Sequence, residues 1–414
     1  MENVFDKKRK QNLNFILPSK YLDKNENDLV KKKKIAVIAH LYYLDTIEYY
    51  FKYIENIPEH IDILLTVSEK KARCIIKESI LNKRKNCRII EKENRGRDIS
   101  AFLVACRKEI LKYDYICFLH DKKANEEIYK ADTEKWIQCL WENMIGSREY
   151  INNLLVFLSK NPKIGLLVPP SFMSEHFASA YSNTWYQNFD RVSELSEKMG
   201  LNCNLDIDKS PITLGTVFWA RVDAIKKLLE IEWKYEDFDE EPLQKDGTLS
   251  HAIERILAYV VQDAGFDTGW VMTDRYAGEM MELMLDALEK AFDTLHLEFG
   301  IHNVSALDNF QERRKKLSEF VSKYKNFYIY GAGIYGKRCL AMLKSVFKMP
   351  AGFLVSDIEG NPEKIGEIPV FSFKDVDIRG CGVVIAVSSK YQAEVEQMIR
   401  GRESDFSDVY LYRN

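Results

Sequence analysis

Two short polar clusters contain residue types that bind phosphorylated ligands. The first is Asn94-Arg95-Gly96-Arg97-Asp98, in which two guanidinium groups flank a glycine. Arginine holds a diphosphate through charge-assisted hydrogen bonds, and glycine lets the backbone approach a ligand closely. Asp98 can cap a helix or accept a hydrogen bond from a ribose hydroxyl. The alternative interpretation is a helix N-terminus with ordinary surface arginines.

The second cluster, His120-Asp121-Lys122-Lys123, directly follows an apolar run at 115–119. Asp121 is its only acid and the candidate ligand for a Mg²⁺ or Mn²⁺ ion, whereas Lys122 can supply the positive charge without a metal. We predict that His120 and Lys122 stabilise a departing diphosphate and that Asp121 orients the nucleotide or sugar. These residue types leave open whether a metal ion is required. A capped strand end with a basic surface loop is the alternative.

The third motif is Gly215-Thr216, which opens a predicted strand at 216–220 containing Trp219. The small pair permits close approach of a sugar ring, and Trp219 can stack on the C–H face of that ring. Packing of Trp219 in the core is the alternative, because large aromatic side chains mostly fill cores.

The fourth motif, Asp246-Gly247-Thr248, leads into a helical stretch at 249–262. His251 and Glu254 are three residues apart and therefore share one flank of that helix. A carboxylate there can act as a general base toward an attacking hydroxyl, and Asp246 and Glu254 are the candidates. In the alternative interpretation Asp246 is a helix cap and Glu254 belongs to a surface ion pair.

A glycine motif, Gly331-x-Gly333-x-x-Gly336, lies between an apolar strand and a helical run, and Asp357 ends the next predicted strand. This pattern is typical of dinucleotide-binding turns, although Asp357 is further along the chain than usual. We predict an accessory module that binds a nucleotide or sugar nucleotide. The alternatives are a structural role and an NAD-dependent oxidoreductase that uses this motif.

The elements that must position these residues alternate between strands and helices. Predicted strands cover residues 35–40, 61–67, 88–91, 115–119, 164–168 and 216–220. Such alternation favours an α/β fold with a mostly parallel sheet and helices on both faces. Ligands bind such sheets at the carboxyl ends of the strands, so we expect the polar clusters to converge on one cleft. Residues 171–210 are polar and aromatic without a clear period, which predicts a loop-rich insertion over the site.

The length of 414 residues is enough for two domains of unequal size. We expect a basic lead-in over 1–33, a catalytic α/β domain over 34–277, a charged helical connector over 278–325 and a small Rossmann-like domain over 326–414.

Composition limits the class of protein. The chain is 46% hydrophobic and 30% charged, as in folded globular proteins, and its net charge of −3 gives no global basis for nucleic-acid binding. Basic clusters at 7–10 and 31–34 either contact anionic lipid or form a solvated lead-in. The eight cysteines form no C-x-x-C motif and no secretory signal precedes them, which favours the reducing cytoplasm. Any membrane contact is expected to be peripheral.

Taken in order, the four motifs at 94–98, 120–123, 215–219 and 246–255 resemble the rhamnan synthesis protein F family, over about residues 33–275. The resemblance implies a GT-A-like fold and a rhamnosyltransferase that uses dTDP-L-rhamnose and acts on a lipid-linked glycan at the inner membrane face. The final module is similar to small Rossmann domains appended to glycan-assembly enzymes. We therefore expect transfer of L-rhamnose with inversion, with Arg95 and Arg97 on the diphosphate. A non-catalytic glycan-binding or scaffold subunit is the alternative outside catalysis.

Overall fold

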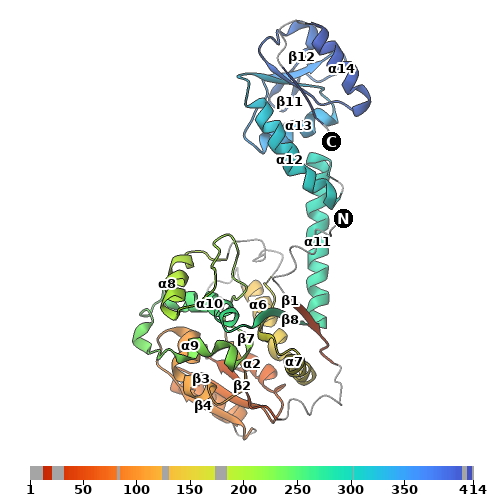
Figure 1. The fold of residues 1–414 in the computed structure, drawn as a ribbon. Helices are drawn as coiled ribbons and strands as arrows, with labels where there is room; N and C mark the ends of the chain where they lie inside the picture. The colour runs from red at the N-terminus through yellow and green to blue at the C-terminus, as the bar shows by residue number, and fades with distance from the viewer. Residues whose placement is uncertain are drawn as a thin grey trace. The chain divides into compact units, whose positions relative to one another are not determined.

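The computed structural model describes residues 13–20, 32–81, 84–123, 130–172, 184–301, 303–402 and 408–412. The chain divides into two compact units, Met1–Leu283 and Met284–Asn414. Each unit contains a mostly parallel sheet with helices, so the predicted α/β class is confirmed (Figure 1). Among the described residues, none of the helices is both long enough and apolar enough to cross a membrane.

The first unit is built on a sheet with the strand order β1-β8-β6-β7-β5-β2-β3-β4. The strands are β1 (Leu13–Leu17), β2 (Ile35–His40), β3 (Asp62–Val67), β4 (Cys87–Glu91), β5 (Tyr115–His120), β6 (Ile164–Val168), β7 (Phe218–Arg221) and β8 (Asp267–Thr273). β7 runs antiparallel to both of its neighbours, and the other pairings in this sheet are parallel. The apolar run of β2 is buried along its whole length, as expected for a parallel strand covered on both faces.

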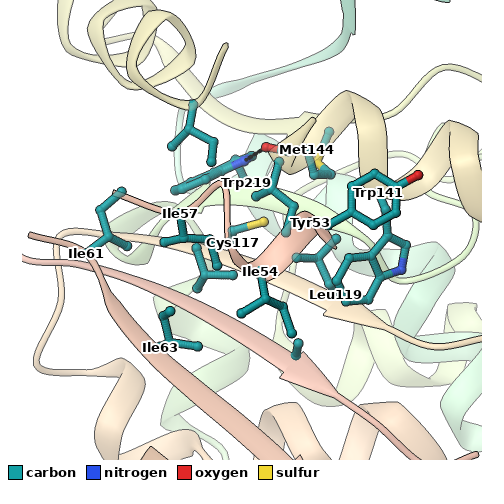
Figure 2. Packing of buried hydrophobic residues seen from close by; sticks show 14 of the residues in the cluster. Tyr53, Ile54, Ile57, Ile61, Ile63, Cys117, Leu119, Trp141, Met144 and Trp219 are labelled. Atoms are coloured by element: carbon teal, nitrogen blue, oxygen red, sulfur yellow. Dashed lines mark hydrogen bonds between the residues drawn. The ribbon is translucent and has the colours of Figure 1, made fainter. Parts of the chain in front are cut away.

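Helices cover both faces of this sheet. Among the described residues before 264, the α-helices of the unit are α2 (Ile47–Ile54), α3 (Lys70–Ile76), α4 (Arg97–Ser100), α5 (Arg107–Ile110), α6 (Lys130–Ile145), α7 (Arg148–Lys160), α8 (Phe189–Met199), α9 (Lys226–Glu230) and α10 (Leu249–Asp263). Alternate residues of β2 point to opposite faces: Val37 packs with α2, α6 and α7, whereas Ile38 packs with α8 and α10. Figure 2 shows part of the first of these two cores.

Two features of the first unit differ from the sequence analysis. The predicted lead-in contains β1, which pairs in parallel with β8 at the edge of the sheet. Only alternate residues of this strand are partly buried, so its apolar signal is weak. The predicted loop-rich insertion at 171–210 contains α8, whose Val192, Leu195 and Met199 pack against α10. Residues 1–12, 21–31 and 173–183 lie outside the described residues, and with them most of the basic clusters.

The second unit has a sheet with the order β11-β12-β10-β9-β13-β14. Its strands are β9 (Phe327–Tyr330), β10 (Gly352–Val355), β11 (Lys364–Ile365), β12 (Ile368–Ser372), β13 (Gly382–Ile385) and β14 (Val409–Leu411), and its helices include α13 (Ile334–Lys344) and α14 (Ser389–Arg402). The stretch predicted as a helical connector forms α11 (Asp274–Phe299) and α12 (Val304–Val321). Leu317 and Phe320 of α12 pack against the strands of the second sheet, so α12 is part of that unit's core.

Candidate functional site

A cavity of about 430 Å³, here called the first cavity, opens at the carboxyl ends of β2 and β5 in the first unit. The predicted site residues that line it are Asn94, Arg97, Asp98, His120, Asp121, Lys122, Thr216, His251 and Glu254. β2 and β5 are neighbours that pair His40 with His120, so both strand ends reach the same edge. Because β7 is antiparallel, the residues just before it lie at this edge too. The structure therefore brings the arginine turn, the end of β5 and the start of α10 to one cavity.

The arginine turn depends on glycine. Gly96 has a φ of +71°, and a Cβ placed on it would lie 2.5 Å from Cγ of Phe238. The side chain of Arg95 leaves the cavity: its Nε and Nη2 donate to the Phe238 carbonyl oxygen at 2.9 and 2.7 Å. This corrects the expectation that both arginines face a ligand. Arg97 lines the cavity, and Arg95 fixes the neighbouring chain segment.

Asp98 and Asn94, which belong to the same turn, also line the first cavity. The Asp98 carboxylate lies 3.8 Å from Nε2 of His120. Burial raises the pKa of Asp98, but the nearby charges of His120, Lys122 and His40 outweigh it, and the net direction is downward. Asp98 is therefore a charged acceptor within a group of cations and donors. Asn94 contacts the hydroxyl of Tyr42 at 3.5 Å.

His120 joins β5 to the third motif. Its Nε2 lies 2.6 Å from the Gly215 carbonyl oxygen, and an N–H on this atom donates there. Burial lowers the pKa of His120, with the Asp98 charge opposing that shift. Gly215 has a φ of +92°, and Thr216 follows with a φ of +47°. The hydrogen bond thus holds the His120 ring and the Gly215 backbone in place. Gly215 itself does not line the first cavity.

Asp121 does not fit the role of a metal ligand. Its Oδ2 accepts hydrogen bonds from the backbone N–H groups of Tyr42 and Tyr43, both at 2.7 Å, and only 4% of the residue is exposed. Burial raises the pKa of Asp121 to about 7, despite these two hydrogen bonds. The described residues contain no group of three or more His, Cys, Asp or Glu side chains arranged to hold a metal ion. Asp121 instead fixes the loop after β2.

Lys122 supplies positive charge at the centre of the site. Its Nζ lies 4.2 Å from the ring centroid of Trp136 on α6, within the range of a cation–π contact. Burial lowers the pKa of Lys122, while the carboxylates of Glu254 and Asp98 act in the opposite direction. A ligand anion entering the cavity would therefore meet a lysine that lies over an aromatic ring, within reach of the charges of two acids.

The two candidate bases occupy different environments. Glu254 accepts from Thr216 Oγ1 at 3.1 Å and from Arg255 at 3.4 Å, and its side chain is 15% exposed. Asp246 accepts from Asn188 Nδ2 at 2.8 Å and from the Gln187 backbone at 3.1 Å, and it does not line the first cavity. Burial raises the pKa of Asp246, but these hydrogen bonds and the Arg255 charge lower it more. The structure therefore favours Glu254 as the base.

Two other parts of the fourth motif also have defined places. Thr248 caps α10, with its hydroxyl 2.8 Å from Nδ1 of His251. Burial lowers the pKa of His251.

A second cavity of about 590 Å³ adjoins the first, and both are lined by Lys122, Trp136, His251 and Glu254. Gly215 and Asp246 line only this second cavity.

Trp219 does not form a sugar platform. The residue is fully buried, and its indole nitrogen donates to the Met144 carbonyl at 2.9 Å, within the core shown in Figure 2. Alternation along β7 explains the outcome, because Trp219 faces α6 and α7 whereas Phe218 faces the opposite core.

Several residues of the first cavity were missed by the sequence analysis. His40, Tyr42 and Tyr43 follow or end β2, and Trp136 lies on α6. The first three could have been found by the rule that identified the end of β5, since β2 is also an apolar strand with polar residues after it. His40 is buried, which lowers its pKa to about 3 and keeps it neutral. Trp136 carries no sequence signal that separates it from a core residue.

The glycine motif forms a strand–turn–helix in the second unit. Gly331 directly follows β9 with a φ of +111°, and a Cβ on Gly336 would lie 1.9 Å from the Gly331 carbonyl oxygen. These two glycines are thus needed for close packing of α13 on the turn. A Cβ on Gly333 would meet open space. Asp357 is exposed and accepts from the Glu359 backbone N–H at 3.1 Å.

Comparison with known proteins gives a match to one family model, described as rhamnan synthesis protein F, over residues 1–266. An uncharacterized protein WxcX of Xanthomonas campestris pv. campestris strain B100 is 27% identical over 235 residues, which cover 56% of this chain and 32% of that protein. The WxcX protein of strain ATCC 33913 matches to the same extent. The match thus spans about a third of the length of these curated relatives.

Proposed function

The chain belongs to the rhamnan synthesis protein F family, and on this premise we propose that it is a glycosyltransferase of bacterial surface-polysaccharide synthesis. It transfers L-rhamnose or a related sugar from a nucleoside diphosphate to a glycan hydroxyl. The donor that we propose is dTDP-L-rhamnose. The acceptor is a growing, lipid-linked glycan at the inner face of the cell membrane. A GT-A-like arrangement of the first unit is part of the same proposal.

The observation that carries this proposal is the meeting of cations and a carboxylate at the first cavity. Arg97 and Lys122 offer positive charge and N–H donors for a diphosphate, and Asp98 offers an acceptor for a ribose or sugar hydroxyl. His120 lines the same cavity, but its Nε2 N–H already donates to the Gly215 carbonyl oxygen. Glu254 lines the same cavity from α10. An inverting sugar transfer needs groups that stabilise the leaving diphosphate and a base that takes the proton of the acceptor hydroxyl.

In the proposed step Glu254 takes the proton as the O–H bond of the acceptor breaks. A bond forms between that oxygen and the anomeric carbon of the donor, while the bond from this carbon to the diphosphate breaks. The diphosphate leaves with the electron pair, and Arg97 and Lys122 stabilise its added negative charge. Thr216 and Arg255 hold the Glu254 carboxylate in position for the proton transfer.

The proposal is tested with the purified full chain and a panel of nucleotide sugars. We expect binding of thymidine diphosphate and its sugar, and a loss of turnover of about 10²- to 10⁴-fold in Glu254→Gln. Asp263→Asn is the matched control, since Asp263 is a carboxylate of the same helix, α10, that lines neither cavity. A folded protein that binds no nucleotide sugar would refute the proposal. Full turnover in Glu254→Gln would show that Glu254 is not the base, and a wild-type chain that binds the nucleotide sugar without turnover would favour the scaffold interpretation.

For the second unit we propose a nucleotide- or sugar-nucleotide-binding role. The supporting observation is the positive φ of Gly331 together with the open space at Gly333, which leaves room for a phosphate near the start of α13. An oxidoreductase that uses this turn predicts quenching of NADH fluorescence that is lost in Gly333→Asp. Calorimetric binding of a second equivalent of thymidine diphosphate that is lost in Gly333→Asp, without binding of NADH, would favour the accessory role.

A further inference from the structure

The second cavity differs in chemistry from the first although the two share a wall. Its lining includes Pro169, Pro170, Phe172 and Tyr186, and the aromatic ring of Trp136 belongs to both cavities. The first cavity is lined instead by the charged and polar residues at the ends of β2 and β5. Charged residues of both signs also line the second cavity: Lys122, Lys245 and Arg255 with Asp246 and Glu254. The second cavity therefore offers apolar surface beside charges that nearly balance, which suits a neutral ligand with an apolar face.

Tyr186 offers an exposed ring in the second cavity for contact with a flat apolar face. Trp136 and Phe172 are stacked on each other, with ring centroids 5.9 Å apart and an interplanar angle of 18°, and Nζ of Lys122 lies 4.2 Å from the Trp136 centroid. Tyr186 is 55% exposed, unlike most large aromatic residues of this unit, and the Arg255 guanidinium lies 5.8 Å from its ring centroid. Its φ of +47° is costly for a residue with a side chain. An exposed ring in a strained conformation beside a cavity is typical of a ligand-binding residue.

Polar groups lie on the wall that separates the two cavities. Glu254 and Lys122 line both, and Glu254 is the proposed base of the transfer. A hydroxyl that approaches Glu254 from the second cavity would meet a donor sugar held in the first. The two cavities would thus bring the acceptor hydroxyl and the donor sugar to the same carboxylate.

We propose that the second cavity is the acceptor subsite and that it binds a neutral pyranose at the end of a glycan. The apolar C–H face of this sugar stacks on Tyr186, and one of its hydroxyls points to Glu254. That hydroxyl gives its proton to Glu254 and bonds to the anomeric carbon of the donor, whose bond to the diphosphate breaks with the electron pair leaving on the diphosphate. The inference rests on the proposed function, because it assumes that the first cavity holds the donor.

The probe is methyl α-L-rhamnopyranoside, added to the full chain with thymidine diphosphate already bound. Saturation-transfer NMR measures sugar binding, and calorimetry measures the affinity for thymidine diphosphate separately. Tyr186→Ala should weaken sugar binding by about three- to tenfold, the amount expected for loss of one aromatic contact, and leave the diphosphate affinity unchanged. Leu214→Trp should abolish sugar binding, because Leu214 lines the second cavity and the larger side chain fills it.

Tyr49→Ala is the matched control, because Tyr49 is an exposed tyrosine that lines neither cavity. It should leave sugar binding unchanged. The inference is overturned if the sugar does not bind, or if Tyr49→Ala weakens binding while Tyr186→Ala does not. Failure of thymidine diphosphate to bind the wild-type chain would instead refute the proposed function, so the two failures are distinguishable.

Discussion

Replacement of Gly96 by alanine tests whether the arginine turn is fixed in the way the structure shows. Two separate costs are expected. The φ of +71° is a left-handed conformation, which costs a residue with a Cβ about 1–2 kcal/mol. The new Cβ would also lie 2.5, 2.8 and 2.9 Å from three atoms of Phe238, a buried side chain, and such overlap typically costs about 1–3 kcal/mol. The total loss in the free energy of unfolding is therefore roughly 2–5 kcal/mol.

Gly200→Ala provides the control that separates these two costs. Gly200 has a similar φ of +60°, but a Cβ there would have no atom within 4 Å, so only the backbone cost applies. Denaturant unfolding of both variants should show that Gly96→Ala loses about 1–3 kcal/mol more than Gly200→Ala. Affinity for thymidine diphosphate should also fall in Gly96→Ala, because Arg97 and Asp98 follow the strained turn directly. Equal losses of stability in the two variants would refute the contact with Phe238.

Three further predictions concern single residues. Trp219→Phe should lower the free energy of unfolding by about 1–3 kcal/mol in denaturant titrations, because it leaves the buried Met144 carbonyl without its donor. Unchanged affinity for thymidine diphosphate would agree with the place of Trp219 in the core, whereas a loss of affinity would contradict it. Arg97→Gln should weaken binding of thymidine diphosphate about tenfold or more by calorimetry, since a charged donor to the diphosphate is lost. The folded pKa of Asp121, about 7, lies above its unfolded value of about 4, so its contribution to stability is full below pH 4 and is lost as the pH rises to about 7. Asp121→Asn should therefore gain stability relative to wild type across that interval, and a constant difference between the two proteins would show that the carboxyl does not titrate there.

The strands beside the site could be predicted because their signal is strong. β2 and β5 are continuous apolar runs followed by polar residues, and the rule that parallel sheets bind ligands at strand ends applies to both. β1 was missed because it lies at an edge with exposed alternate residues. α8 was missed because its few apolar residues are separated by charged ones, although their spacing is helical.

Side-chain direction within the site could not be read from the sequence. Arg95 and Arg97 are equivalent as residue types, yet one bonds to a backbone carbonyl and the other lines the cavity. The difference arises from the left-handed conformation of Gly96 between them, which no composition rule reports. Asp246 and Glu254 were equally good candidates for the same reason, because their separate partners, Asn188 and Thr216, come from distant parts of the chain.

The reversed direction of β7 has a consequence for how this sheet can change during evolution. In a wholly parallel sheet, each loop at the ligand-binding edge follows the strand whose end it extends. Here the loop that contains Thr216 lies at that edge but precedes its strand, β7. An insertion or deletion immediately before β7 would shift Thr216 and with it Glu254. The chain after β7 turns away at the opposite edge of the sheet, and we expect related proteins to vary more freely in length there.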